Sequence, residues 1–309
     1  MEFYISWSHS DAKFSHYFNE CPMLISTVPD NNRPLKKLKK QPNKLIIDSG
    51  AIFYAKYNKV SVQEIFHKQL DILQDATSSI KTIKLVQLDV PLFDKKNLSA
   101  KYGAMEKNLY FAWEYINLFK KSSLPSKIQP MAVIQGFDKP SIEFCILELR
   151  KMGYQYLGIG SLLTKNPKEQ LSLIQAAVRL IGTEYLHVFG VSGLEQIKKM
   201  ASMKNITSFD SSRPTKAVAY YSVFYSNPFR TYILGNSRVA KSGPRLDKPL
   251  PCSCPVCLNN PHDILIPSPR HYMKLRSIHN YYHLNRTIQT IVAQNERMNP
   301  CVVSNVLRT

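Results

Sequence analysis

Residues 131–160 read MAVIQGFDKPSIEFCILELRKMGYQYLGIG, and this stretch contains the unit from which the fold is expected to be built. Apolar runs at 131–135 and 155–160 predict two strands. The segment between them predicts a helix at 141–152, with Pro140 near its start. Both strands are apolar along nearly their whole length, which is typical of parallel strands covered on both faces. The stretch therefore predicts a β-α-β unit.

The same alternation recurs on both sides of this unit. The expected strands occupy residues 2–7, 22–27, 44–48, 83–89, 131–135, 155–160, 185–190 and 206–210. Helices are expected at 11–20, from a capping box at Ser61 and Glu64 to about 78, and at 103–121, 141–152, 167–181 and 193–203. Eight strands, with helices between most of them, predict an α/β fold, a (β/α)₈ TIM barrel. An open doubly wound sheet is the alternative, but no G-x-G-x-x-G follows the first strand, which disfavours its dinucleotide-binding form.

The composition limits the classes of protein to which the chain can belong. Hydrophobic residues make up 44% of its 309 residues, so a wholly disordered chain is excluded. We find no apolar run of about 18 residues that would cross a membrane. The start of the sequence lacks the basic region of a signal peptide, so a cytoplasmic location is expected. With 41 Lys+Arg against 22 Asp+Glu, the net charge of +19 favours a nucleic acid partner. An anionic membrane and a merely basic protein are weaker alternatives.

Clustered cysteines predict a metal site towards the end of the chain. Three of the six cysteines fall within six residues: Cys252, Cys254 and Cys257. Structural zinc takes four ligands, commonly Cys₃His. His279 and His283 lie one turn apart on an expected helix, so either can supply the fourth ligand. His262 and His271 are less favoured alternatives that the sequence does not exclude. The sequence therefore predicts structural zinc rather than a disulfide framework.

Two domains are expected. Residues 1–226 would form the barrel catalytic domain, including a further helix at 212–226. Residues 227–309 would form a zinc-binding subdomain, loop-rich up to 267, whose long final helix at 268–297 packs on the barrel.

Polar residues follow the expected strands at the end where barrel enzymes place their chemistry. Asp48, Asp89 and Asp210 end the third, fourth and eighth strands, and Gln135 ends the fifth. Carboxylates crowded into one pocket shift one another's pKa, so one can act as an acid while another stays ionised. A helix cap or a turn is the simpler interpretation of any single Asp. Glycines at the same ends suit either a flat ligand or tight turns: Gly50, Gly136, Gly160 and Gly190.

Several motifs, in order along the chain, resemble the tRNA-guanine transglycosylase superfamily. They are LIIDSG at 45–50, LDVP at 88–91, VIQG at 133–136, GIGSL at 158–162, HVFGVSG at 187–193, SFDSSRPTK at 208–216, CSCPVC at 252–257 and SIHN at 277–280. The cysteine motif with its downstream His-Asn is the most specific of them. The resemblance covers about residues 44–285. It implies a zinc-bearing TIM barrel that replaces guanine in a polynucleotide by a free 7-deazaguanine base.

The resemblance also implies roles for individual residues. Asp210 would be the nucleophile and Asp48 the general acid/base. The substrate-binding residues would be Ser49, Asp89, Gln135, Gly160, Ser161, Leu162 and Phe189, with Asp89 and Gln135 reading the purine edge. Ser161 stands where the family has the second glycine of its G-G-L-A motif. The His-Asn context favours His279 as the zinc ligand, although the family's usual interval from Cys257 lands on His283.

A shortened N-terminus, a compact zinc region and an altered SFDSSRPTK stretch resemble the DNA-modifying branch, which inserts bases such as preQ₀ into bacterial or phage DNA. DNA is therefore the expected partner, with tRNA as the alternative. A non-catalytic nucleic-acid-binding subunit of the same fold and another barrel glycosidase are further alternatives. Candidate phosphate contacts are KKLKK at 36–40, Arg213, Lys216, Arg230, Arg238, Lys241 and Arg245. The aromatics of AYYSVFY at 219–225 would stack on bases or, as helical spacing favours, join the core.

Overall fold

The computed structural model describes residues 1–28, 34–54, 60–93, 95–191, 193–235 and 243–298, and the chain forms two compact units. The barrel unit comprises Glu2–Gly193 and Asn205–Ser212. The C-terminal unit comprises Leu194–Lys204 and Arg213–Thr309, together with Met1. The expected division into a catalytic domain at 1–226 and a zinc-binding subdomain at 227–309 stays a prediction.

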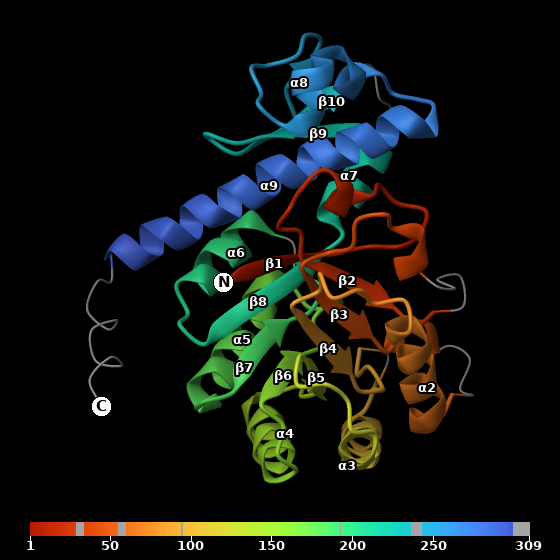
Figure 1. Cartoon of the computed structure of the whole chain (residues 1–309). Helices are drawn as coiled ribbons and strands as arrows, with labels where there is room; N and C mark the ends of the chain where they lie inside the picture. Colours follow the sequence, from red (N-terminus) through yellow and green to blue (C-terminus); the bar gives the residue numbers. More distant parts are fainter. Residues whose placement is uncertain (29–33, 55–59, 94, 192, 236–242, 299–309) are drawn as a thin grey trace, which may run out of the picture. The chain divides into compact units, whose positions relative to one another are not determined.

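The barrel unit is built on eight strands that close into a ring in sequence order (Figure 1). They are β1 (Glu2–Ser6), β2 (Met23–Ser26), β3 (Lys44–Asp48), β4 (Thr82–Val86), β5 (Ile128–Ile134), β6 (Tyr156–Ile159), β7 (Tyr185–Val188) and β8 (Ile206–Ser211). Every neighbouring pair is parallel, and β1 pairs with β8 to complete the ring, with Tyr4 opposite Asp210. The expected TIM barrel is thereby confirmed.

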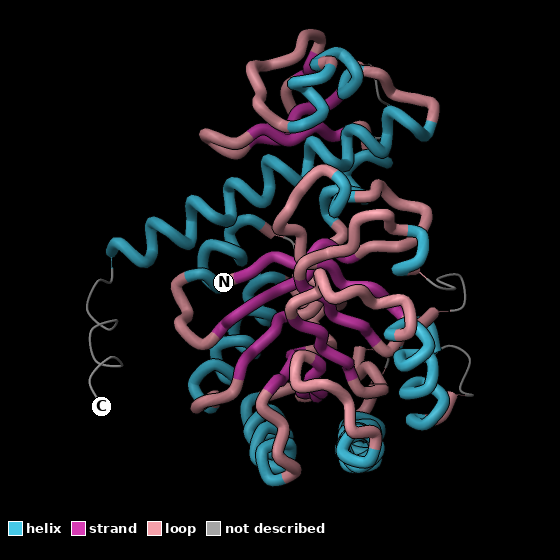
Figure 2. The backbone as a smooth tube through the Cα atoms, in the orientation of Figure 1, coloured by secondary structure: helices cyan, strands magenta, loops and turns pink. Residues whose placement is uncertain are grey.

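Helices cover the outside of the ring (Figure 2). They are α1 (Ala51–Tyr54), α2 (Val62–Leu73), α3 (Leu98–Lys121), α4 (Lys139–Lys151) and α5 (Pro167–Leu180), with short 3₁₀ turns at Phe14–His16 and Leu35–Lys37. The Ser61–Glu64 capping box opens α2 as expected. Asn97 caps α3 through the backbone N–H of Ala100, so this helix begins five residues before the expected position.

The helix expected at 11–20 is wrong, because only a 3₁₀ turn forms there. The indole N–H of Trp7 donates to the carbonyl of Ala12, and the side chains of Ala12 and Phe14 are buried. Tertiary contacts thus hold this segment as a loop against the barrel.

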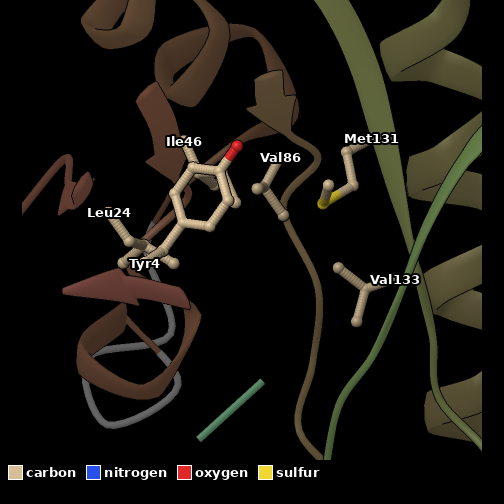
Figure 3. Close-up of a cluster of buried hydrophobic side chains, with 6 residues drawn as sticks. All are labelled: Tyr4, Leu24, Ile46, Val86, Met131 and Val133. Atoms are coloured by element: carbon tan, nitrogen blue, oxygen red, sulfur yellow. The ribbon is translucent and has the colours of Figure 1, made fainter. Parts of the chain in front are cut away.

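A cluster of buried hydrophobic side chains lies among the barrel strands (Figure 3). Its members come from the first five strands: Tyr4, Leu24, Ile46, Val86, Met131 and Val133. Leu24 and Val133 also line the cavity described below.

The C-terminal unit is organised by one long helix, α9 (Arg270–Met298). Around it lie α6 (Leu194–Ala201), α7 (Arg213–Ala219), α8 (Pro255–Asn259), a 3₁₀ turn at Pro261–Leu265, and a sheet of β9 (Ser222–Tyr225), β10 (Arg230–Leu234) and β11 (Arg245–Leu246). Strands β9 and β10 are antiparallel, and β11 pairs with β10 in parallel.

The helix expected at 212–226 is correct only in its first half. Tyr221 has a φ of +57°, a left-handed conformation that a helix cannot continue through, and β9 follows. The second half of the segment 219–225 is therefore a strand, in which Val223, Phe224 and Tyr225 are buried. Within the described ranges, every helix is too short or too polar to cross a bilayer.

Candidate active site and metal centre

A cavity of about 230 Å³ lies at the C-terminal ends of the barrel strands. Its polar lining residues include Asp48, Asp89, Gln135, Ser161 and Asp210. Its apolar walls are formed by Leu24, Ile52, Phe93, Val133, Leu162, Leu163 and Phe189. A mostly apolar cavity with a few convergent polar groups is typical of a small-molecule binding site.

Asp48 ends strand β3 and reaches the cavity from there. Its Oδ2 accepts a hydrogen bond from the backbone N–H of Gly50 at 2.9 Å. Gly50 has a φ of +78°, and a Cβ there would come within 3.1 Å of Ser26 and Val28, so glycine is required at this turn. Burial raises the pKa of Asp48 to about 6, and the charge of Asp210 contributes, while the Gly50 hydrogen bond opposes the shift.

Asp210, on β8, is held by three hydrogen-bond donors. Oδ2 accepts from the hydroxyl of Ser6 at 2.6 Å, and Oδ1 accepts from the backbone N–H of Gly190 at 2.9 Å. Nε2 of His187 lies 3.4 Å from the same Oδ1. Burial alone would raise the pKa of Asp210, but these donors outweigh it and hold the pKa below its usual value. Asp210 is therefore a buried carboxylate that stays ionised.

Asp89 lies in the loop after β4 and is linked to Gln135 and Ser161 by a chain of hydrogen bonds. Nε2 of Gln135 donates to Asp89 Oδ2 at 2.5 Å, and the Ser161 hydroxyl donates to Gln135 Oε1 at 2.5 Å. The Ser49 hydroxyl donates weakly to Asp89 Oδ1 at 3.5 Å. Burial, followed by the charge of Asp48, raises the pKa of Asp89 to about 7. A Cβ at Gly160 would lie 2.7 Å from Gln135 Nε2, so this glycine leaves room for the amide.

Two buried amides hold the loops that carry these groups. Asn108 of α3 bonds both the N–H and the carbonyl of Val90, which fixes the chain directly after Asp89. Gln69 of α2 donates to the carbonyls of Ile47 and Val86, at the ends of β3 and β4. Because these amides are buried and fully engaged, the loops they hold are pre-organised.

The predicted site residues mostly gather around this one cavity. Ser49 is the exception, since it does not line the cavity but contacts Asp89 behind it. Ser6 and His187 were not anticipated, because a serine and a histidine inside apolar strands carry no spacing signal. Ile52, Phe93 and Leu163 were also missed as cavity walls.

The candidate phosphate contacts differ in their exposure. Lys36, Lys37, Lys39 and Lys40 are exposed, as are Lys216, Arg230 and Arg245. Arg213 instead lies over the rings of Phe224 and Phe229, at 5.2 and 5.5 Å from their centroids. Arg238 and Lys241 lie outside the described residues.

The C-terminal unit contains a Cys₃His cluster that can hold a metal ion. Its ligand atoms all lie within 4.8 Å of one another and belong to Cys252, Cys254, Cys257 and His279. Nδ1 of His279 lies 3.7, 3.4 and 3.3 Å from the three sulfur atoms in that order. Nε2 of His279 lies 2.9 Å from the carbonyl oxygen of Phe224, to which it donates. The lone pair of Nδ1 is therefore free to bind a metal, as in other metal-binding histidines.

His283 occupies a different position beside the same cluster. The backbone N–H of Ser226 donates to Nδ1 of His283 at 3.0 Å, so Nδ1 is the unprotonated nitrogen. Nε2 then carries the proton and lies 3.1 Å from the sulfur of Cys252. His283 contacts the sulfur of one cysteine, whereas His279 contacts the sulfurs of all three. The expected preference for His279 thus agrees with the geometry of the cluster.

Comparison with known proteins identifies a family. A family model described as queuine tRNA-ribosyltransferase matches residues 28–294, a range that contains Asp48, Asp89, Asp210 and the whole Cys₃His cluster. A search of curated proteins gives no match.

Proposed function

The chain belongs to the queuine tRNA-ribosyltransferase family, whose members are transglycosylases that act on nucleic acid, and from this premise we propose that it exchanges guanine in DNA for a 7-deazaguanine base such as preQ₀. The reaction passes through a covalent intermediate in which Asp210 is bonded to the sugar. The single observation that carries the proposal is one cavity lined by Asp48, Asp89 and Asp210, of which only Asp210 has a lowered pKa.

In the first step, a lone pair of the Asp210 carboxylate forms a bond to C1′ of the nucleotide. The C1′–N9 bond breaks, and its electrons leave with guanine, which takes a proton from Asp48. The target nucleotide must leave its base stack to reach the cavity. A low pKa at Asp210 and a raised pKa at Asp48 suit a nucleophile and an acid, respectively.

In the second step, guanine leaves and a 7-deazaguanine takes its place. Asp48, now a carboxylate, removes a proton from N9 of the incoming base. N9 attacks C1′, and the C1′–oxygen bond breaks with its electrons returning to Asp210. The energy of the glycosidic bond is kept in the ester throughout, so the exchange needs no further energy source.

Base recognition is proposed for the residues around Asp89. The ionised Asp89 carboxylate would accept hydrogen bonds from N1–H and the exocyclic amine of guanine. Gln135 and the backbone of Gly160, Ser161 and Leu162 would contact the other edge, and Phe189 would pack against the ring. Ser49 would act from behind Asp89, through its hydroxyl.

Zinc is the metal proposed for the Cys₃His cluster, because three thiolates and one imidazole are a common closed ligand set for it. Cys252, Cys254, Cys257 and His279 would hold the ion. A closed site has no open position, so the ion would stabilise the C-terminal unit and supply no chemistry to the exchange.

The choice of DNA rests on the sequence features that resemble the DNA-modifying branch, whereas the net charge of +19 suits DNA and tRNA alike. The description of the matching family favours tRNA as the second candidate. Exchange of labelled guanine into duplex DNA, single-stranded DNA or unmodified tRNA distinguishes them. Label in DNA alone supports the proposal, label in tRNA alone replaces its substrate, and label in neither contradicts both.

The matched control for this experiment is Asp210→Asn, which keeps the size of the side chain and removes its charge. Asp71→Asn, on the exposed face of α2, serves as the neutral control. Incorporation that survives in Asp210→Asn would overturn the covalent mechanism even if the substrate proved correct.

A further inference from the structure

We propose that His187 is a positioning residue that fixes the Asp210 carboxylate and makes Oδ2 the oxygen that attacks the sugar. The inference rests on the proposed function, since it concerns the same nucleophile. It assigns a role to a buried histidine that neither base recognition nor general acid catalysis uses.

The hydrogen bonds of His187 determine which ring nitrogen carries the proton. Nε2 lies 3.4 Å from Oδ1 of Asp210, and an ionised carboxylate can only accept. Nε2 is therefore the protonated nitrogen. Nδ1 lies 2.9 Å from the hydroxyl of Ser208, which donates to it. Ser208 thus holds the tautomer that presents a donor to the nucleophile.

Local structure holds the ring in this place. The ladder between β7 and β8 shifts register between Leu186 and His187, so that His187 lies opposite Ser208 rather than opposite Thr207. Such irregularities often redirect side chains next to active sites. The ring of His187 packs edge-on against Phe189, at 4.6 Å between centroids, and against Tyr4, at 5.8 Å. With no exposed surface, the side chain has no room to turn.

The two oxygens of Asp210 are left unequal. Oδ1 receives two donors, His187 Nε2–H and Gly190 N–H, whereas Oδ2 receives the Ser6 hydroxyl. Oδ2 therefore keeps the more available lone pair. It forms the bond to C1′ while the C1′–N9 pair leaves with guanine, and Oδ1 becomes the carbonyl oxygen of the ester.

The same donors act in the return step. When N9 of the incoming base attacks C1′, the C1′–Oδ2 bond breaks and the carboxylate recovers its negative charge. His187 and Gly190 are already placed on Oδ1 to stabilise that charge. Loss of the His187 donor should slow the return step by about ten- to a hundredfold, because the recovered charge then lacks one hydrogen bond. It should slow the first step by a similar factor, because the carboxylate is no longer held in one orientation.

The test traps the covalent intermediate. The full chain is mixed with DNA or tRNA in the absence of free base, denatured at set times and run on a gel that separates the protein–nucleic acid adduct. Adduct is then chased with guanine to measure the return step. The variants are His187→Leu, which removes the donor, His187→Gln, whose side-chain amide can replace the Nε2 donor, and Ser208→Ala. Thermal unfolding of each variant shows that it is folded.

We expect His187→Leu to form and release adduct about ten- to a hundredfold more slowly, with unchanged affinity for the polynucleotide. His187→Gln should recover most of the rate, which a purely packing role would not predict. Adduct kinetics in His187→Leu equal to those of the unsubstituted chain would overturn the inference, as would His187→Gln no faster than His187→Leu. Adduct in the unsubstituted chain but not in Asp210→Asn keeps the proposed function independent of this outcome, whereas absence of any adduct in the unsubstituted chain would defeat both.

Discussion

Asp48 and Asp210 line one cavity, yet their pKa values are displaced in opposite directions. Burial raises the pKa of both carboxyls, so the difference comes from their hydrogen-bond donors and from neighbouring charges. Asp210 accepts from Ser6, Gly190 and His187, and these donors outweigh desolvation. The donors to Asp48, among them the Gly50 N–H, do not. One cavity thereby holds an ionised carboxylate and a carboxyl that stays protonated to higher pH.

Replacement of the proposed nucleophile should abolish exchange. Asp210→Asn cannot form the glycosyl ester, so we expect the rate of guanine exchange to fall by roughly 10⁴-fold or more, the scale seen when a nucleophile is removed. Labelled guanine incorporation measures the rate. Asp71→Asn should retain full activity. A residual rate within tenfold of the unsubstituted chain would show that Asp210 does not carry the covalent step.

The rate of exchange should depend on pH within a narrow window. The proposed active form carries a proton on Asp48, whose pKa is raised to about 6, and a charge on Asp89, whose pKa is raised to about 7. That form is most populated between those two values. Above the window Asp48 loses its proton, and below it Asp89 gains one, so kcat/KM should fall on both sides. A rate that keeps rising through pH 8 would contradict these roles.

Binding of the free base should test the role of Asp89 separately from the covalent step. In Asp89→Asn the amide presents a donor where guanine needs an acceptor, so we expect affinity for guanine to fall by about 10- to 100-fold. Equilibrium dialysis with labelled guanine measures it. The unsubstituted chain should also bind more weakly as pH falls below about 7, whereas Asp89→Asn should bind equally across that range. Unchanged affinity in the variant would remove Asp89 from base recognition.

Substitution of His279 and of His283 in α9 should affect metal binding to different degrees. We expect His279→Ala to lose the bound ion and to unfold at lower temperature, because it removes a ligand. His283→Ala removes a donor to the Cys252 thiolate and should weaken metal affinity by only about 10- to 100-fold. His262→Ala, at an exposed position, is the matched control. Metal content and chelator competition measure the effect, and the reverse order of losses would make His283 the ligand.

Much of the barrel could be predicted because its strands are short apolar runs and because capping residues mark the starts of several helices between them. The eight strands lie where their hydrophobic runs predict them, since burial on both faces leaves little choice of residue. The failures have local causes. Segment 11–20 is held as a loop by Trp7 and by burial of Phe14, and Tyr221 ends α7 through its left-handed backbone. Neither the packing of segment 11–20 nor the backbone conformation of Tyr221 produces a periodic pattern in the sequence.

The candidate site could likewise be predicted only in part. Asp48 and Asp210 lie at the carboxyl ends of β3 and β8, and Asp89 lies just after β4, so the barrel fold brings all three to one end. Ser6 and His187 could not be found in this way, because each matters only through its distance to Asp210 across neighbouring strands. The choice between His279 and His283 likewise needed the positions of the Ser226 and Phe224 backbones.

The pairing of β1 with β8 brings together the Ser6 hydroxyl and the Asp210 carboxylate, which are 204 residues apart in the sequence. During synthesis on the ribosome the serine emerges among the first residues, but its partner appears only after the seven preceding strands have been made. A chain whose synthesis has stopped before β8 therefore lacks the hydrogen bond between Ser6 and Asp210. The proposed nucleophile therefore gains its Ser6 donor only when the first and last strands of the barrel pair and the ring closes.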